Sequence, residues 1–163
     1  PGMAVWPAAM IVWGPGFHSA AHRHHCVQLV MALHGSLRVR GGSGTAWTTC
    51  GAVLVRPDAE HEVDAGTTAV LIGFIDAESE MGAALADRIS GDIAPVPLPE
   101  VTRWRAVLGR APSEATAERW LTRYLLRRAR TVRSSTPCAM PSAGTTLPPP
   151  RRKPPRSCPR TRT

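Results

Sequence analysis

The sequence lacks several features that would assign it to a class directly. Its four cysteines form no C-x-x-C pair, which argues against a zinc ribbon and a thioredoxin-like redox motif. No apolar run approaches the ~18 residues that a membrane span needs. The first residues carry no basic segment, so we expect no signal peptide, no membrane partner and a cytoplasmic location. We therefore expect Cys26 and Cys50 to be buried free thiols.

Acidic residues are missing from the end of the chain. The 163 residues hold 20 Lys and Arg and 12 Asp and Glu, and all 12 acidic residues lie within residues 1–128. Residues 129–163 carry 8 basic residues, which account for the net charge of +8, and 8 of the 16 prolines. This segment cannot bury enough apolar surface to offset its chain entropy, so we expect a disordered basic tail. The overall basicity therefore does not make the remainder a nucleic-acid binder.

Short strands are predicted through the first half of the chain. In SLRVR, residues 36–40, apolar and polar side chains alternate with the two-residue period of a half-buried strand. The segments with strand character are 9–13, 24–33, 36–40, 45–50, 52–56, 61–64 and 69–76. Strands this short, separated by Gly and Pro turns, predict a mainly β sandwich or small barrel.

Helical periodicity begins after Asp76. Apolar residues recur at every fourth position in 78–90, and further helices are expected at 101–109 and 112–128, with an extended segment at 94–99 between them. The last helix gathers four large apolar residues on one face, namely Trp120, Leu121, Tyr124 and Leu125. This face is either a dimer contact or the side on which the helix docks against its own barrel.

The most informative motif surrounds a cluster of histidines. Gly16, His22, His24, Gln28 and Gly35 follow the pattern G-x5-H-x-H-x3-Q-x6-G. Residues two apart on a strand point to the same side, so His22 and His24 converge, and Gln28 joins them by parity if the strand continues.

A further histidine, His61, arrives from another strand after the turn at Pro57, and it could complete the cluster. Neutral imidazoles in a concave site are natural ligands for Fe, Mn, Ni or Zn.

This spacing resembles the two signature motifs of the cupin superfamily, whose fold is a double-stranded β-helix barrel. In that family two histidines and a glutamate of the first motif bind a metal together with a histidine of the second. His22 and His24 match, and His61 matches the third histidine. Gln28 stands in place of the glutamate, and an amide is a poor metal ligand. In the second motif Ala59 replaces a glycine.

The longer stretches narrow the resemblance. HRHHCVQLVMALHGSLRVR, AVLVRPDAEHEVDAG and AVLIGFIDAES are similar to the N-terminal, RmlC-like regulatory domain of AraC/XylS-type transcription regulators. In that family a cupin barrel, usually without metal, senses a small effector, and the helices that follow it dimerise. A C-terminal pair of helix-turn-helix units binds DNA.

No segment after residue 128 has the periodicity of helix-turn-helix units, which need on the order of 100 residues. We therefore hypothesise a truncated or frame-shifted regulator whose reading frame leaves the family's sequence near 126–130. Retranslating the gene in the other two frames tests this, because the missing helices should be encoded there.

We therefore predict a mainly β fold: a cupin (jelly-roll) barrel at 1–77, a helical linker and dimerisation region at 78–128, and a disordered tail at 129–163. The predicted function is that of an effector-sensing domain of an AraC-family regulator. Its partners would be a small-molecule effector and a second copy of the chain, without specific DNA binding. The expected ligand-binding residues are His22, His24, Gln28, Arg38 and His61.

Two alternatives stay open. The first is a small metal-dependent cupin enzyme, a dioxygenase or isomerase, in which His22, His24 and His61 would hold a divalent metal. The second is a simple storage or binding cupin without a regulatory partner. The sensor itself is predicted to be no enzyme and to need no cofactor. Arg38, Arg40 and Arg56 could reach an anionic effector, but an exposed face of a strand is the commoner place for arginine.

Overall fold

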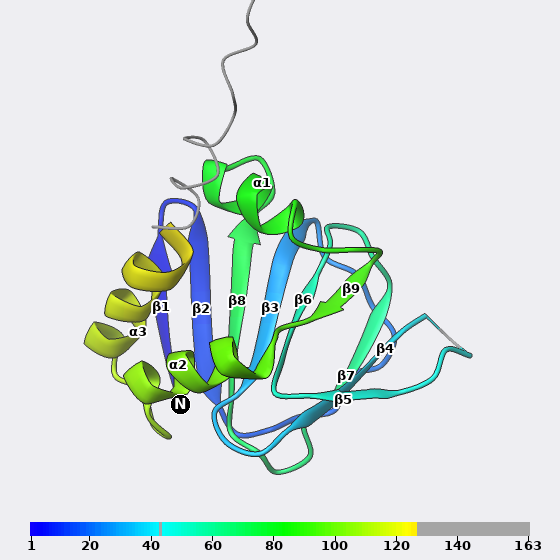
Figure 1. Ribbon diagram of the computed structural model, residues 1–163, viewed down its shortest axis with the longest axis horizontal. Helices are drawn as coiled ribbons and strands as arrows, with labels where there is room; N and C mark the ends of the chain where they lie inside the picture. Colours follow the sequence, from blue (N-terminus) through cyan, green and yellow to red (C-terminus); the bar gives the residue numbers. More distant parts are fainter. Residues whose placement is uncertain (43, 127–163) are drawn as a thin grey trace, which may run out of the picture.

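The structure is a computed structural model that describes residues 1–42 and 44–126 (Figure 1). The strands are β1 (Gly2–Trp6), β2 (Ala9–Gly14), β3 (Cys26–Ala32), β4 (Leu37–Gly41), β5 (Thr48–Cys50), β6 (Ala52–Val55), β7 (His61–Asp64), β8 (Val70–Asp76) and β9 (Ile93–Pro95). The helices are α1 (Glu80–Ala86), α2 (Leu98–Leu108) and α3 (Glu114–Trp120), and a π-helical turn (Leu121–Leu126) continues α3. The tail predicted at 129–163 lies outside the described residues.

Two antiparallel sheets make the body of the protein. The large sheet has six strands in the order β1-β2-β8-β3-β6-β9, and the small sheet has three in the order β5-β4-β7. Between them lies a core of small apolar side chains, among them Val30 and Val53 from the large sheet and Leu37, Val39 and Val63 from the small one. The predicted mainly β jelly-roll fold, followed by helices, is confirmed.

The other face of the large sheet is covered by the helices. Leu29, Met31 and Leu71 point to this outer face and belong to a second apolar core with Trp104 of α2 and Trp120 of α3. The two indole rings meet edge to face with their centroids 5.6 Å apart. α2 and α3 therefore lie against the large sheet on the side away from the small one (Figure 1).

This packing decides between the two alternatives for the apolar face of the last helix. Trp120 and Leu121 are buried in the core of their own chain, and Tyr124 packs against it. The helix thus docks on its own barrel through these residues. Its start matches the predicted helix-start chemistry, because Ser113 caps it and shares a reciprocal capping box with Thr116.

The helical region also adds to the sheet. β9, which lies between α1 and α2, pairs with β6 in the register Val53↔Pro95 and Val55↔Ile93. The segments predicted as barrel and as helical region therefore share one sheet and one core. Within the described part of the chain, no helix is long and apolar enough to cross a membrane.

Candidate ligand site at three converging histidines

The segment between β2 and β3 carries two of the three histidines along the edge of the small sheet. His22 lies directly opposite His61 of β7, and their backbones exchange both N–H···O bonds, at 3.0 and 2.9 Å. The approach is close at Gly16, where an added Cβ would come within 2.3 Å of the carbonyl oxygen of Gly66. The glycine that opens the motif thus lets this segment lie against the turn after β7.

The three imidazoles form one cluster. His24 follows His22 by two residues and points to the same side, and the residues that flank His24 on either side, Arg23 and His25, are exposed. The ring centroid of His22 lies 4.8 Å from that of His24 and 4.3 Å from that of His61. One nitrogen from each ring lies within 4.8 Å of the others. The predicted convergence of His22, His24 and His61 is therefore present in the structure.

Backbone carbonyls fix the protonation of two rings. Nδ1 of His22 lies 2.7 Å from the carbonyl oxygen of Ala20, and Nδ1 of His61 lies 2.9 Å from that of Ala59. A carbonyl can only accept, so each Nδ1 carries the proton and each Nε2 keeps its lone pair. The Nε2 atom of His61 is buried and has no hydrogen-bond partner among the described residues. The site therefore offers a buried acceptor, the Nε2 of His61, for which the described part of the chain supplies no donor.

Burial favours the neutral form of two of the three rings, His24 and His61. It lowers the pKa of His61, and the neighbouring imidazoles of His22 and His24 lower it further against the opposing effect of the Ala59 carbonyl. Burial also lowers the pKa of His24, with a smaller contribution from His22. Both rings are thus uncharged at neutral pH, which is the form that binds a metal ion or accepts a hydrogen bond.

Gln28 lies on the inner face of the large sheet. It is almost fully buried in β3, and its Oε1 has no partner among the described residues. It pairs with Phe74 of β8, so both side chains project from the same face of the large sheet. The Phe74 ring stands edge-on to His24, with centroids 5.2 Å apart. Gln28 therefore lines the same side of the sheet as the residue that contacts the cluster.

Arg38 is not brought to the histidines. On β4 it alternates with the inward-facing Leu37 and Val39, and it lies on the outer face of the small sheet in an ion pair with Asp64. It also lies over the ring of Trp47, at 5.2 Å from the ring centroid. His25 also points away from the cluster. It is exposed and pairs with Asp58.

Sequence reasoning missed Phe74 and the two carbonyls that set the tautomers. Phe74 lies in a run of apolar residues, AVLIGFID, in which nothing in the pattern shows which side chains face inward. Backbone carbonyls leave no trace in a motif at all.

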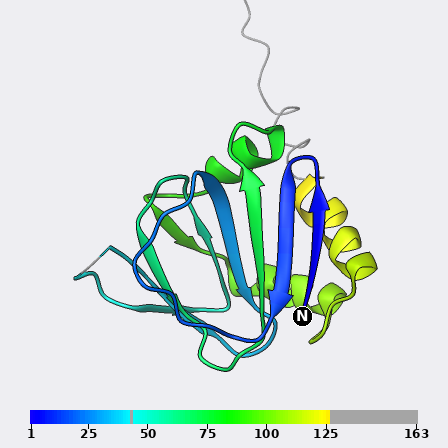
Figure 2. The same cartoon turned by 180° about the vertical axis from the view of Figure 1, so that it is seen from behind.

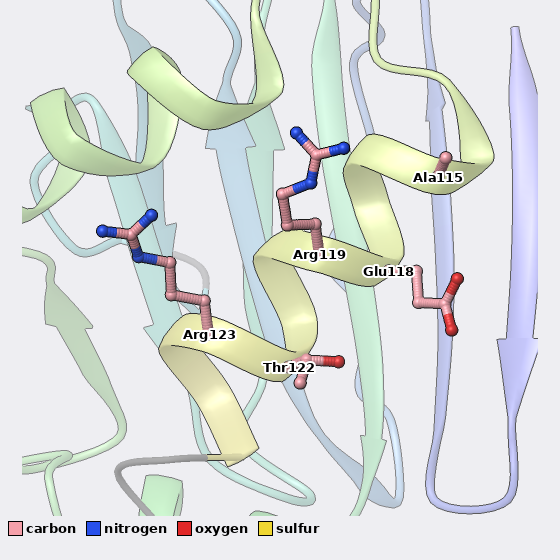
Figure 3. Close-up of a pocket in the computed structure, with 5 residues that line it drawn as sticks. All are labelled: Ala115, Glu118, Arg119, Thr122 and Arg123. Atoms are coloured by element: carbon pink, nitrogen blue, oxygen red, sulfur yellow. The ribbon is translucent and has the colours of Figure 1, made fainter.

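A separate hollow lies on the exposed side of α3 and of the turn after it (Figure 3). α3 itself packs on the outer face of the large sheet. It is lined by Ala115, Glu118, Arg119, Thr122 and Arg123. Three of these five side chains are charged, and none of the five belongs to the histidine motif.

No protein-family model and no curated protein sequence matches this chain. Among solved structures, a Cupin 2 conserved barrel domain protein from Salinispora arenicola is similar at 23% identity over 52% of this chain and 76% of its own, with a TM-score of 0.35. An RmlC-like cupin from Shewanella frigidimarina is similar at 21% identity over 44% and 68%, with a TM-score of 0.33. Fatty-acid-bound ToxT from Vibrio cholerae is similar at 9% identity over 78% and 54%, with a TM-score of 0.45. At these identities the likeness concerns the fold alone.

Proposed function

We propose that this chain is the ligand-sensing barrel of a transcription regulator of the AraC/XylS type. One observation carries the proposal: a single sheet separates the histidine cluster from the helices. Gln28 and Phe74 project from its inner face toward the side of the cluster, and Leu29, next along β3, packs against the helices on the outer face. Because adjacent residues point to opposite faces, a ligand that moves β3 or β8 also moves the surface on which α2 rests.

Hydrogen bonds from α2 to the end of β3 and to the turn after it support this coupling. The guanidinium of Arg105 on α2 donates from Nε to the carbonyl oxygen of Ala32 at 2.9 Å and from an Nη to that of Gly35 at 2.7 Å. These carbonyls belong to the end of β3 and to the turn that follows it. α2 is therefore hydrogen-bonded to the end of the strand that carries Gln28. A small-molecule effector that shifts this strand would shift the helices with it.

The partners in this proposal are a small-molecule effector and a second copy of the chain. The predicted dimer contact through the C-terminal helices cannot use Trp120 and Leu121, since these already pack on the chain's own sheet. It would use the exposed side of α3 drawn in Figure 3, where Arg119 and Arg123 lie beside Glu118. Specific DNA contacts are not part of the proposal for the described residues.

A thermal-shift screen tests the sensing role. The full chain is melted with each member of a library of small polar molecules, and each stabilising compound is tested again on His24→Ala. At ~100 times Kd a true ligand should raise Tm by roughly 5–10 °C. The shift should vanish in His24→Ala and persist in His25→Ala, a matched change of the exposed neighbour that points away from the cluster. A screen in which every shift survives His24→Ala would contradict the proposal.

A metal-dependent enzyme is the second candidate, and the ligand set favours it. Three imidazole nitrogens lie within 4.8 Å of one another, and the Nε2 of His61 has no partner among the described residues. These three donors fit a divalent ion of the Fe, Mn, Ni or Zn class, whereas Gln28, in place of the family's glutamate, offers only an amide, which is a poor metal ligand. A bound ion would act as a Lewis acid toward substrate.

Elemental analysis separates the two candidates. The purified full chain is compared with the double variant His22→Ala/His24→Ala. Near-stoichiometric metal that the double variant loses would favour the enzyme, whereas a folded, metal-free protein would favour the sensor.

A further inference from the structure

The large sheet extends beyond the small sheet that faces it. Strand register defines two rows of side chains across its inner face, from β1 through β2, β8 and β3 to β6. The first row is Met3, Val12, Ile72, Val30 and Val53, and the second is Val5, Met10, Phe74, Gln28 and Val55. Except for Gln28 every member is apolar, so the apolar inner wall of the barrel continues outward along β8, β2 and β1.

The small sheet covers only part of these two rows. Val30 and Val53 are fully buried beneath the small sheet, whereas Met3 is 59% exposed and Val5 is 66% exposed. The four side chains between them are partly exposed, namely Met10, Val12, Ile72 and Phe74. In Figure 2 neither a helix nor the small sheet stands in front of this half of the large sheet. We call the six residues Met3, Val5, Met10, Val12, Ile72 and Phe74 the apolar platform.

The platform is continuous with the histidine cluster and is small. Phe74 is a member of the platform and also contacts the cluster, since its ring stands edge-on to that of His24. Three strands of about five residues span roughly 17 by 14 Å, or about 240 Å². A stable protein–protein interface buries ~800 Å² on each partner, so the platform alone falls well short of a docking face for another protein. Its size and its polar end suit a small molecule.

We propose that the ligand of this site is a small amphipathic molecule whose apolar chain or ring lies on the platform and whose polar end donates a hydrogen bond to the histidines. This rests on the proposed ligand-binding role of the cluster. The platform has no charged member, which matches an apolar group. The Nε2 atoms of His22 and His61 keep lone pairs, because each Nδ1 donates to a backbone carbonyl. They therefore suit a hydroxyl or an amine rather than a carboxylate.

Primary alcohols of increasing length test both ends of this ligand. Calorimetric titration of the EDTA-treated full chain with 1-butanol, 1-hexanol and 1-octanol should show binding that tightens about fourfold for each methylene that the platform buries. A methyl ether of the same length as 1-octanol lacks the hydroxyl donor and should bind about tenfold more weakly. Alcohols that do not bind, or an ether that binds as well as the alcohol, would overturn the proposal.

Three variants locate the binding. Met3→Gln and Val5→Thr make exposed side chains polar at nearly constant size, and together they should weaken 1-octanol binding about tenfold and flatten its dependence on chain length. Leu98→Gln is the matched control, because Leu98 is equally exposed, at 67%, but lies on α2. It should leave the titration unchanged.

The outcomes also separate this inference from the proposed function. A ligand that needs His24 but ignores Met3 and Val5 would overturn the platform and leave the sensor standing. If no ligand were found whose binding needs His24, both the platform inference and the sensor proposal would be contradicted. A dimer in sedimentation that Met3→Gln and Val5→Thr dissociate would assign the platform to a second copy and overturn the small-molecule inference.

Discussion

His22, His24 and His61 are organised by backbone rather than by side-chain partners. The antiparallel pairing of His22 with His61 brings two rings together, and the carbonyls of Ala20 and Ala59 set their tautomers. The motif spacing predicted the convergence correctly, because parity on an extended segment follows from sequence alone. It could not predict the tautomers, which depend on main-chain atoms that every residue has.

Protonation of the cluster should make stability depend on pH. Burial first, and neighbouring imidazoles second, lower the pKa of His24 and His61 below 6.5, and unfolding restores it. The unfolded chain therefore binds more protons, so the stabilising contribution is complete above pH 6.5 and is lost as pH falls through the folded pKa. Urea unfolding at pH 7.5, 6.5 and 5.5, with EDTA present, should show this loss, and His24→Gln should reduce it.

His25 supplies a control of opposite sign. Its hydrogen bond with the Asp58 carboxylate raises its pKa, so its contribution is present below pH 6.5 and is lost as pH rises. His25→Gln should therefore steepen the decline in stability toward pH 5.5. If His24→Gln and His25→Gln changed the pH profile in the same direction, the lowered pKa of His24 would be contradicted.

At the scale of elements, the segment that carries His22 and His24 depends on Gly16. A Cβ there would lie 2.3 Å from the Gly66 carbonyl oxygen and 2.6 Å from that of Thr68, and backbone cannot move aside cheaply. Gly16→Ala should cost about 2–3 kcal/mol in the free energy of unfolding and should weaken any ligand that needs His24. Urea unfolding and calorimetry measure the two effects.

Gly91→Ala is the comparison for Gly16→Ala. Gly91 has open space around its Cβ position and a φ of +75°, so only the backbone conformation is strained. This variant should lose about 1 kcal/mol and keep ligand binding. Equal losses of stability and binding in the two variants would contradict the role given to the close approach at Gly16.

Arg105 should matter more than an ordinary surface arginine. Its guanidinium joins α2 to the carbonyls of Ala32 and Gly35, so Arg105→Met leaves two acceptors without their charged donor. We expect a loss of about 2 kcal/mol in the free energy of unfolding. Arg103→Met on the same helix removes only a bond to Pro99 within that helix and should stay within ~0.5 kcal/mol. If the two substitutions lowered the free energy of unfolding equally, the hydrogen bonds of Arg105 would not be what stabilises α2 against the sheet.

The elements that sequence reasoning found are those with a clear period. The alternation in 36–40 gave β4, and the helix expected at 101–109 is present as α2, from Leu98 to Leu108. β1 was missed because GMAVW holds no polar residue, so no alternation marks it as a strand, and the three-residue β9 was expected only as part of an extended segment at 94–99. Both lie at the ends of the large sheet, and only the fold shows that β1 carries two of the six residues of the apolar platform.

At the scale of the whole molecule, the large sheet packs against a different layer on each of its two faces. Its inner face lies against the small sheet and faces the histidines, and its outer face holds α2 and α3 through Trp104 and Trp120. The sequence predicted a barrel followed by helices, but not that the helices would share the barrel's core. That sharing depends on contacts between residues about 70 positions apart, such as Arg105 with Ala32, which no local pattern records.

Hydrogen exchange of the α2 amides is the most direct test of whether the large sheet connects the histidine site to the helices. Exchange is measured with and without a ligand whose binding needs His24, and in Arg105→Met as well as in the unaltered chain. We expect the bound ligand to change exchange across Leu98–Leu108 several-fold, and Arg105→Met to reduce this change while leaving binding in place. Binding at the histidines that leaves α2 exchange unchanged would contradict the claim that the sheet connects the site to the helices.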